Sequence, residues 1–478
     1  QEKGYTIVPF DEIADIYIVN TCTVTNIADR KSRQMLHRAK QKNPAALVVA
    51  VGCYVQTGRE DVEQDPCIDL AIGNNRKKDL AAILEEYLEE AVEADAVAES
   101  CDGANGKSDI GDEKKYTGTV GETHKDKTLH DTTVIDINHT AEYEEMTLKQ
   151  TAEHTRAYIK IQDGCNQFCS YCVIPYARGR VRSRKAEDII REITGMAQAG
   201  YREIVLTGIH ISSYGIDFDE EAWKRGESVS VLKEDEERRD YSGSSKLIDL
   251  LERIHDIEGI ERIRIGSLEP RIITEETAAR MAALPKLCPH FHLSLQSGCD
   301  ATLRRMNRKY TSEEYAESVA LLRKVFDHPA ITTDVIVGFP GETEKEFAQT
   351  KEFLDRIQFF EMHIFKYSKR AGTRAAVMSH QVPDPVKTTR SAELLAMEKE
   401  QSKQFRTHYV GREAEVLLEE TKEIGGMEYL LGHTRDYVKL AVSVKENKKN
   451  VANTVICGRV QGFLTDEILL LSPLEFSK

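Results

Sequence analysis

Residues 157–180 read AYIKIQDGCNQFCSYCVIPYARGR, and this stretch decides the fold class of the 478-residue chain. AYIKIQ is typical of a buried strand, and Cys165, Cys169 and Cys172 follow it on one loop with the spacing C-x3-C-x2-C. Three thiolates on one loop can bind three irons of a [4Fe-4S] cluster and leave the fourth iron open to an exogenous ligand. Zinc is the alternative, but a structural zinc site needs a fourth protein ligand, and the local sequence offers none at a suitable spacing.

Strand and helix patterns alternate along most of the chain. Residues 156–367 contain six β-rich segments with amphipathic helices between them, which fits a partial (β/α) barrel, with a doubly wound sheet as the alternative. In both folds the active site lies at the C-terminal ends of the strands, where the three cysteines are placed. We expect an α/β chain with five parts: an N-terminal α/β domain (1–84), an acidic flexible linker (85–150), the partial barrel (151–382), a connecting helix (386–408) and a small antiparallel β-barrel (409–478).

The net charge of -15 is concentrated in two segments. Residues 85–145 hold 18 Asp and Glu against 5 Lys, and residues 217–245 hold 10 acidic against 5 basic side chains. Both read as solvated segments, the first as a linker and the second as a surface insertion. Residues 156–185 instead carry seven Lys and Arg against Asp163 alone. The whole-chain charge therefore does not exclude a nucleic-acid partner, because a basic patch surrounds the cysteines.

The composition also bears on the compartment. No apolar run reaches the ~18 residues that a membrane span needs. Ten cysteines among 478 residues are too sparse for a disulfide framework. We expect a reduced, cytoplasmic chain with no membrane partner.

Two further cysteines follow strand patterns near the start of the chain. Cys22 lies in IVNTCTVTNIADRKSRQ directly after one strand, and Cys53 lies in VAVGCY after the next. Parallel strands end at the same edge of a sheet, so the two thiols could converge on one site. By spacing alone, ordinary buried cysteines are the favoured interpretation.

Several of these motifs together resemble the radical S-adenosylmethionine (SAM) methylthiotransferase family. They are NTC, GCY, IGNN, GCNQFCSYCVIPYARGRVRSR and LTGIHISSYG, followed by a small barrel that resembles the RNA-binding TRAM domain. The resemblance spans nearly the whole chain. NTCTVTNIADRKSRQ and YCVIPYARGRVRSR are most similar to the subfamily that acts on N6-threonylcarbamoyladenosine beside the anticodon of tRNA.

The resemblance implies two [4Fe-4S] clusters and SAM as cofactors. Cys165, Cys169 and Cys172 would hold the SAM-cleaving cluster. Nine positions match those that line the SAM pocket or the substrate side of the family: Tyr171, Thr207, Gly208, Ser267, Glu269, Ser294, Gln296, Asp334 and Gly338. For each of them an ordinary strand-end or turn residue is the alternative interpretation.

The auxiliary cluster of the family carries the sulfur and has three cysteine ligands. Cys22 and Cys53 match two of them. The third lies in the family on a Gly-Cys turn that precedes a segment like EKGYTIVPF, and this chain shows no such turn. We therefore expect that an N-terminal segment is missing, with Cys67 as a weaker substitute for the third ligand.

The implied reaction uses one SAM to methylate a sulfur and a second as the source of a 5′-deoxyadenosyl radical. The radical takes hydrogen from C2 of the adenine, and a methylthio group is transferred there; side-chain acid–base chemistry cannot functionalise such a C–H bond. The implied partners are the tRNA anticodon stem-loop and an electron donor. The residues expected to contact RNA phosphates are Arg178, Arg180, Arg182, Arg184 and Lys185.

Two sets of alternatives remain. The same chemistry could act on N6-isopentenyladenosine in tRNA or on an aspartate of a ribosomal protein. A non-catalytic iron–sulfur protein that binds RNA is the alternative from another class, and the full set of SAM-pocket-like strand ends argues against it.

Overall fold

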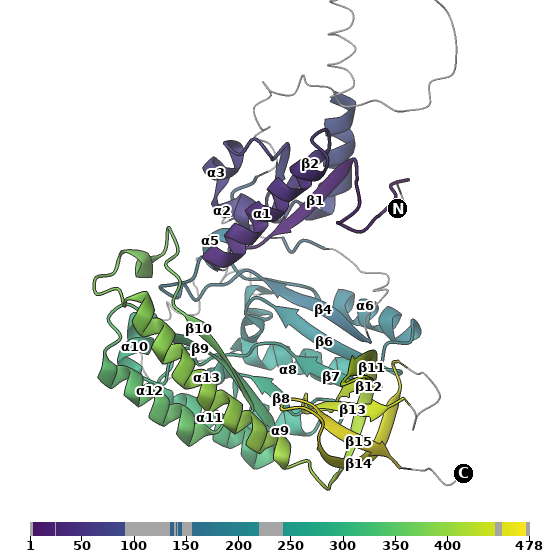
Figure 1. The fold of residues 1–478 in the computed structure, drawn as a ribbon, viewed down its shortest axis with the longest axis vertical. Coiled ribbons are helices and arrows are strands. Elements are labelled where there is room, and N and C mark those ends of the chain that lie inside the picture. Colours follow the sequence, from purple (N-terminus) through teal and green to yellow (C-terminus); the bar gives the residue numbers. More distant parts are fainter. Residues whose placement is uncertain are drawn as a thin grey trace, which may run out of the picture. The chain divides into compact units, whose positions relative to one another are not determined.

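The structure is a computed structural model (Figure 1). It describes residues 3–23, 25–90, 134–137, 140, 142–145, 155–218, 242–444 and 452–474. Most of the two acidic segments, which we interpret as linker and surface insertion, lies outside the described residues. The chain forms two compact units, Gln1–Met146 with Val173–Gly179, and Thr147–Cys172 with Arg180–Lys478. The division into five parts stays a prediction.

The first unit contains a three-stranded parallel sheet with the order β1-β2-β3. Its elements are β1 (Ile16–Thr21), α1 (Asn26–Lys42), β2 (Leu47–Gly52), α2 (Cys53–Thr57), α3 (Arg59–Glu63), β3 (Leu70–Ile72), the 3-10 turn η1 (Lys77–Asp79) and helical residues 80–90. Thr25 caps α1 by accepting a hydrogen bond from the Ala28 amide. Gly52 has a φ of 106°, and a Cβ there would lie 2.9 Å from the Thr21 carbonyl oxygen. The glycine thus permits the sharp turn that places Cys53 directly after β2.

Six parallel strands follow one another in sequence order in the second unit. They are β4 (Arg156–Asp163), β6 (Glu203–Gly208), β7 (Arg262–Ile265), β8 (His290–His292), β9 (Ala330–Val337) and β10 (Glu361–Lys366). Among them β4, β6 and β7 pair in turn, and β8, β9 and β10 pair in turn. Isolated bridges, including Leu268 to Leu293, join β7 to β8, and the short β5 (Arg182–Ser183) pairs antiparallel with β4. Sequential order without a reversal is the pattern of a barrel and not of a doubly wound sheet. The predicted α/β fold class with a partial barrel is confirmed.

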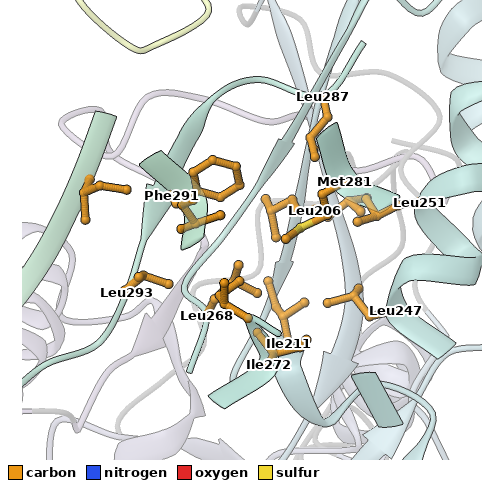
Figure 2. Close-up of a cluster of buried hydrophobic side chains, with 14 of the residues drawn as sticks. Leu206, Ile211, Leu247, Leu251, Leu268, Ile272, Met281, Leu287, Phe291 and Leu293 are labelled. Atoms are coloured by element: carbon orange, nitrogen blue, oxygen red, sulfur yellow. The ribbon is translucent and has the colours of Figure 1, made fainter. Parts of the chain in front are cut away.

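Helices cover one face of this set of strands. They are α6 (Ala186–Gln198), α8 (Ser242–His255), α9 (Glu275–Ala282), α10 (Asp300–Arg305), α11 (Ser312–Val325) and α12 (Glu344–Ile357). The short helix α5 (Ile174–Arg178) belongs to the first unit. Short 3-10 turns lie between them: η5 (Ile211–Ser213), η6 (Ile216–Phe218), η8 (Pro270–Ile272) and η9 (Arg374–Val377). Figure 2 shows the apolar core between the strands and helices, with Leu206, Leu251 and Phe291 among its members. Burial of each such side chain contributes roughly 1.5–3 kcal/mol, so this core holds the strand ends in place.

The helix α13 (Asp384–Thr407) packs along the edge strand β10 and leads into a closed five-stranded barrel. The barrel strands are β11 (Glu413–Ile424), β12 (Met427–His433), β13 (Lys439–Ser443), β14 (Val455–Phe463) and β15 (Leu469–Pro473). Their order is β11-β12-β13-β15-β14, and only the β13–β15 pair is parallel. Its core contains Val416, Leu440 and Leu471, all fully buried. Closure leaves the barrel no free sheet edge.

A buried polar network joins this barrel to the N-terminal ends of β4, β6 and β7. The Glu203 carboxylate lies 3.0 Å from Arg264, 3.6 Å from Arg156 and 3.7 Å from Arg262. The hydroxyl of Tyr437, in the loop between β12 and β13, accepts a hydrogen bond from Arg156 Nη1 at 3.0 Å, and the Tyr437 ring stacks on His290 at 4.9 Å. The terminal barrel is therefore fixed at the end of the sheet opposite to the cysteine loop.

Candidate active site

The three-cysteine loop follows β4 and is held by contacts from both ends. Gly164, with a φ of 72°, turns the chain out of the strand, and its amide donates to Asp163 Oδ1 at 2.8 Å. Further along, Ser170 donates from its amide to the Met306 carbonyl at 3.0 Å, and Asn307 donates to the Phe168 carbonyl at 3.0 Å. The loop thus has a defined shape at the C-terminal end of β4.

The three cysteines of this loop are partly buried and form no disulfide within the described part of the chain. Burial raises the pKa of the Cys165 thiol, and the nearby Cys169 and Cys172 sulfurs raise it further. The Gln167 amide donates to Cys165 Sγ at 3.5 Å, so the loop backbone itself supports one sulfur. The three sulfurs are close enough to affect one another electrostatically, they form no disulfide, and one of them accepts a hydrogen bond from the backbone. These properties fit an iron–sulfur cluster bound through three thiolates.

Arg308 is a central residue of this region that the motifs did not indicate. Its guanidinium donates to Cys169 Sγ at 3.4 Å, to the Ser294 carbonyl at 3.3 Å and to the Tyr310 hydroxyl at 3.0 Å. It also stacks 4.8 Å from the centre of the Tyr310 ring. Arg308 lies 139 residues after Cys169, so no local spacing relates the two.

Glu269 lies beside the same loop. Its carboxylate accepts from Gln167 Nε2 at 3.1 Å, from His210 Nε2 at 3.1 Å and from Arg271 Nε at 2.6 Å. Burial by itself would raise the pKa of this carboxyl, but the His210 hydrogen bond and the nearby arginines lower it to about 2. Glu269 is therefore an anion throughout the physiological range and orders the residue between the first two cysteines.

Other predicted pocket residues also gather at the strand ends. Tyr171 packs edge-on against Phe339 at 6.3 Å, and burial, with the charges of Cys169 and Cys172, raises its pKa. Thr207, at the end of β6, donates to the Ile159 carbonyl at 3.3 Å, and a Cβ on Gly208 would meet Gln162 Oε1 at 3.0 Å. Both positions thus pack against β4, next to the strand that carries the cysteines.

The remaining predicted positions have distinct surroundings. Ser267 is exposed, and the Gln296 amide donates to the Asp334 carbonyl at 2.8 Å. The Asp334 side chain instead faces His292, with 3.4 Å between the nearest N and O. Gly338 has a φ of 71°, and a Cβ there would meet the Lys387 side chain at 2.3 Å, so this glycine is required by the turn after β9.

Cys22 and Cys53 lie at one edge of the sheet in the first unit. β1 and β2 pair in parallel through Thr21 and Gly52, so the cysteine that follows each strand lies at the same edge. Cys53 is buried and accepts from Asn74 Nδ2 at 3.4 Å, whereas Cys22 is exposed. Cys67 precedes β3, which begins beside the start of β2, and therefore lies at the opposite edge. Because of this position, Cys67 cannot replace the third ligand beside Cys22 and Cys53.

The predicted RNA-contacting run needs a correction. Arg182 is 1% exposed and lies 3.9 Å from Asp163, and Arg184 is 3% exposed and ion-paired with Glu192. Buried, paired guanidinium groups are not available to phosphates. Three members of the run remain candidates: Arg178, Arg180 and Lys185, the last of them exposed.

In the described part of the chain, no helix has both the length and the apolarity to cross a membrane.

Comparison with known proteins identifies the family. The model of the radical SAM superfamily matches residues 159–354, and that of the uncharacterized protein family UPF0004 matches residues 1–73. The chain is 36% identical over 448 residues to the threonylcarbamoyladenosine tRNA methylthiotransferase MtaB of Bacillus subtilis, covering 94% of this chain and 86% of that protein. It is 37% identical over 424 residues to the protein of the same name from Aquifex aeolicus, covering 88% of each. It is 34% identical over 441 residues to the tRNA-2-methylthio-N(6)-dimethylallyladenosine synthase of Opitutus terrae, covering 91% of this chain and 85% of that protein. With this identity over most of its length, the chain belongs to the radical SAM methylthiotransferase family, whose members are enzymes that transfer a sulfur-containing group.

Proposed function

We propose that this chain methylthiolates C2 of N6-threonylcarbamoyladenosine next to the anticodon of tRNA. The observation that carries the proposal is 36% identity over 94% of the chain to a protein of that name. The synthases named for N6-dimethylallyladenosine match at 31–34% identity, and that nucleoside is the second candidate substrate.

Cys165, Cys169 and Cys172 would hold the [4Fe-4S] cluster, which when bound supplies the electron that cleaves SAM. The surrounding residues position this chemistry. Glu269 stays ionised and holds Gln167 within the loop, while Arg308 places a positive charge on the Cys169 sulfur. The strand-end residues Tyr171, Thr207, Gly208, Ser267, Ser294, Gln296, Asp334 and Gly338 would line the SAM and substrate sides.

Cys22 and Cys53 would supply two ligands of a second [4Fe-4S] cluster, which when bound carries the sulfur to be inserted. Their common sheet edge supports this pairing, because two strand ends in register bring successive residues close together. Asn74 would orient the Cys53 sulfur through its 3.4 Å contact. The same amide donates to the Ala177 carbonyl at 2.7 Å, so its orientation is fixed from the other side.

Binding of tRNA would use the remaining basic residues and the terminal barrel. Arg178, Arg180 and Lys185 would contact phosphates, and the closed barrel would act as a TRAM-like RNA-binding module. An electron donor is the second partner, and work on tRNA would place the chain in the cytoplasm. The barrel supplies RNA contacts through local patches, since it carries no excess of basic residues.

The test uses full-length protein with reconstituted clusters, SAM, a reductant and two tRNAs. One tRNA carries N6-threonylcarbamoyladenosine and the other N6-isopentenyladenosine. Nucleoside mass spectrometry after digestion is expected to find the methylthio adduct on the first. An adduct on the second tRNA alone would move the assignment to the second candidate. SAM cleavage with no adduct on either tRNA would contradict both.

A further inference from the structure

Three side chains that commonly bind metals meet on adjacent strands of the partial barrel, apart from any cysteine. They are His292 at the end of β8, Asp334 in β9 and His363 in β10, and their ligand atoms all lie within 4.8 Å of one another. Asp334 and His363 are register partners across the β9–β10 pair. Three neighbouring strands therefore deliver the donors from rigid backbone positions.

The cluster lies on the face of the sheet opposite to the helix-packed core. Phe291 and Leu293, on either side of His292, belong to that core (Figure 2), as do Val335 and Met362, which follow Asp334 and precede His363. Successive side chains of a strand point to opposite faces. The three donors thus face the concave side, where the His363 side chain is exposed.

The spacing of two of the donors fits two ligands of one metal ion. His292 Nε2 and Asp334 Oδ2 are 3.4 Å apart, longer than the 2.7–3.2 Å typical of an N–H···O hydrogen bond. Two ligands of a tetrahedral ion with bonds of about 2.1 Å are separated by about 3.4 Å. An ion between these atoms would also neutralise the carboxylate that the two imidazoles surround.

A neighbouring hydroxyl orients the first imidazole. His292 Nδ1 lies 3.1 Å from Thr332 Oγ1, and Thr332 is 3% exposed. When Nδ1 carries the proton and donates to this oxygen, the Nε2 lone pair points toward Asp334. Such a partner on the second nitrogen is the usual arrangement around metal-binding histidines.

We propose that His292, Asp334 and His363 bind one divalent transition-metal ion of the zinc type. Two imidazoles and one carboxylate favour such ions over calcium and magnesium, which prefer oxygen ligands only. Three protein ligands leave at least one coordination position, and the exposure of His363 opens it to an oxygen ligand from solution. The site requires neither iron–sulfur cluster, and it shares Asp334 with the positions that would line the SAM and substrate sides.

The test titrates the full chain, with its clusters reconstituted, with Zn²⁺ in a calorimeter. The background carries Cys67→Ser, because His37, Asp65 and Cys67 form another group of donors within 4.8 Å. We expect one saturable site that is lost in Asp334→Asn and His363→Ala and kept in the matched control His380→Asn, which alters another exposed histidine. Thr332→Val is expected to weaken affinity by about 10–100-fold while keeping all three ligands.

Co²⁺ provides a second readout that distinguishes the ligands. Binding at the proposed site is expected to give tetrahedral d–d absorption without a thiolate-to-cobalt charge-transfer band. Absence of saturable binding would overturn the proposal, as would binding that survives both Asp334→Asn and His363→Ala, or a cobalt spectrum dominated by thiolate. Circular dichroism and iron content verify that the variants are folded and loaded, and the exposed position of His363 makes His363→Ala the decisive variant.

Discussion

Replacing Glu203 by glutamine is expected to loosen the attachment of the terminal barrel. Glu203 is 1% exposed and lies among Arg156, Arg262 and Arg264, which are themselves 8%, 1% and 3% exposed. Glutamine keeps the shape of the side chain but removes the negative charge. Three buried guanidinium groups would then repel one another with less compensation.

The expected loss of stability can be estimated from the distances between Glu203 and the three arginines. At an effective dielectric constant near 20, each contact of Glu203 with an arginine, at 3.0, 3.6 and 3.7 Å, corresponds to roughly 5 kcal/mol of attraction. The cost of burying the charges offsets most of this sum. Removal of one partner from a buried ion pair costs about 3–5 kcal/mol. We expect the free energy needed to open the terminal barrel locally, at β12 and β13, to fall by that amount.

Hydrogen exchange of the β12 and β13 amides measures the free energy of local opening in the strands that flank the Tyr437 loop, where the barrel meets the Glu203 network. The matched control is Glu261→Gln, whose pair with Arg202 is 2.8 Å long but exposed, so a change below about 1 kcal/mol is expected. A loss in Glu203→Gln no larger than in the control would refute the reasoning. It would mean that Glu415, Glu419 and the loop carbonyls suffice for the arginines. If the barrel binds tRNA, Glu203→Gln should also weaken tRNA binding while leaving SAM cleavage intact.

Three further predictions concern charged groups at the site and in the terminal barrel. Burial raises the pKa of Asp436 to about 7, so the folded state loses stability as pH rises from about 4 to 7; Asp436→Asn should stabilise the chain at pH 8 and not at pH 4, by thermal unfolding. Glu269 has its pKa lowered to about 2 from 4.5, so its stabilisation is present above about pH 4.5 and is lost as pH falls toward 2; Glu269→Gln should flatten the acid limb of a stability–pH profile, and an unchanged limb would contradict this. Arg308→Met should make the reduction potential of the cluster more negative, because a positive charge on a ligand sulfur favours the reduced state. A tenfold change in the reduction equilibrium is 59 mV, resolvable by redox titration with paramagnetic resonance, and an unaltered potential would limit Arg308 to a structural role.

Local sequence patterns were sufficient to predict the strands and the cysteine loop. The parallel strands of the partial barrel are runs of apolar residues such as EIVLTG, and their type depends on residues within one segment. The spacing of Cys165, Cys169 and Cys172 is likewise local, since all three lie on one loop. The edge shared by Cys22 and Cys53 followed from the general rule that parallel strands end together.

The surroundings of charged side chains were harder to predict, because they depend on segments that are distant in the sequence. Arg182 and Arg184 look like a basic surface run, yet Asp163 and Glu192 bury and pair them. Arg308 contacts a sulfur 139 residues earlier in the chain, and Arg156 contacts a tyrosine 281 residues later. No spacing in the sequence encodes such pairs.

The amino-acid sequence alone determined the fold class, the cysteine loop and the family to which the chain is similar. Those features depend on periodicity, on turn residues and on motifs within short segments. Only the tertiary structure decided which strand ends face one another and which charges are buried. Strand register sets these neighbours, and a shift by one residue would turn His292, Asp334 or His363 to the opposite face. The chemistry of single segments could therefore be predicted, whereas its combination into sites required the folded chain.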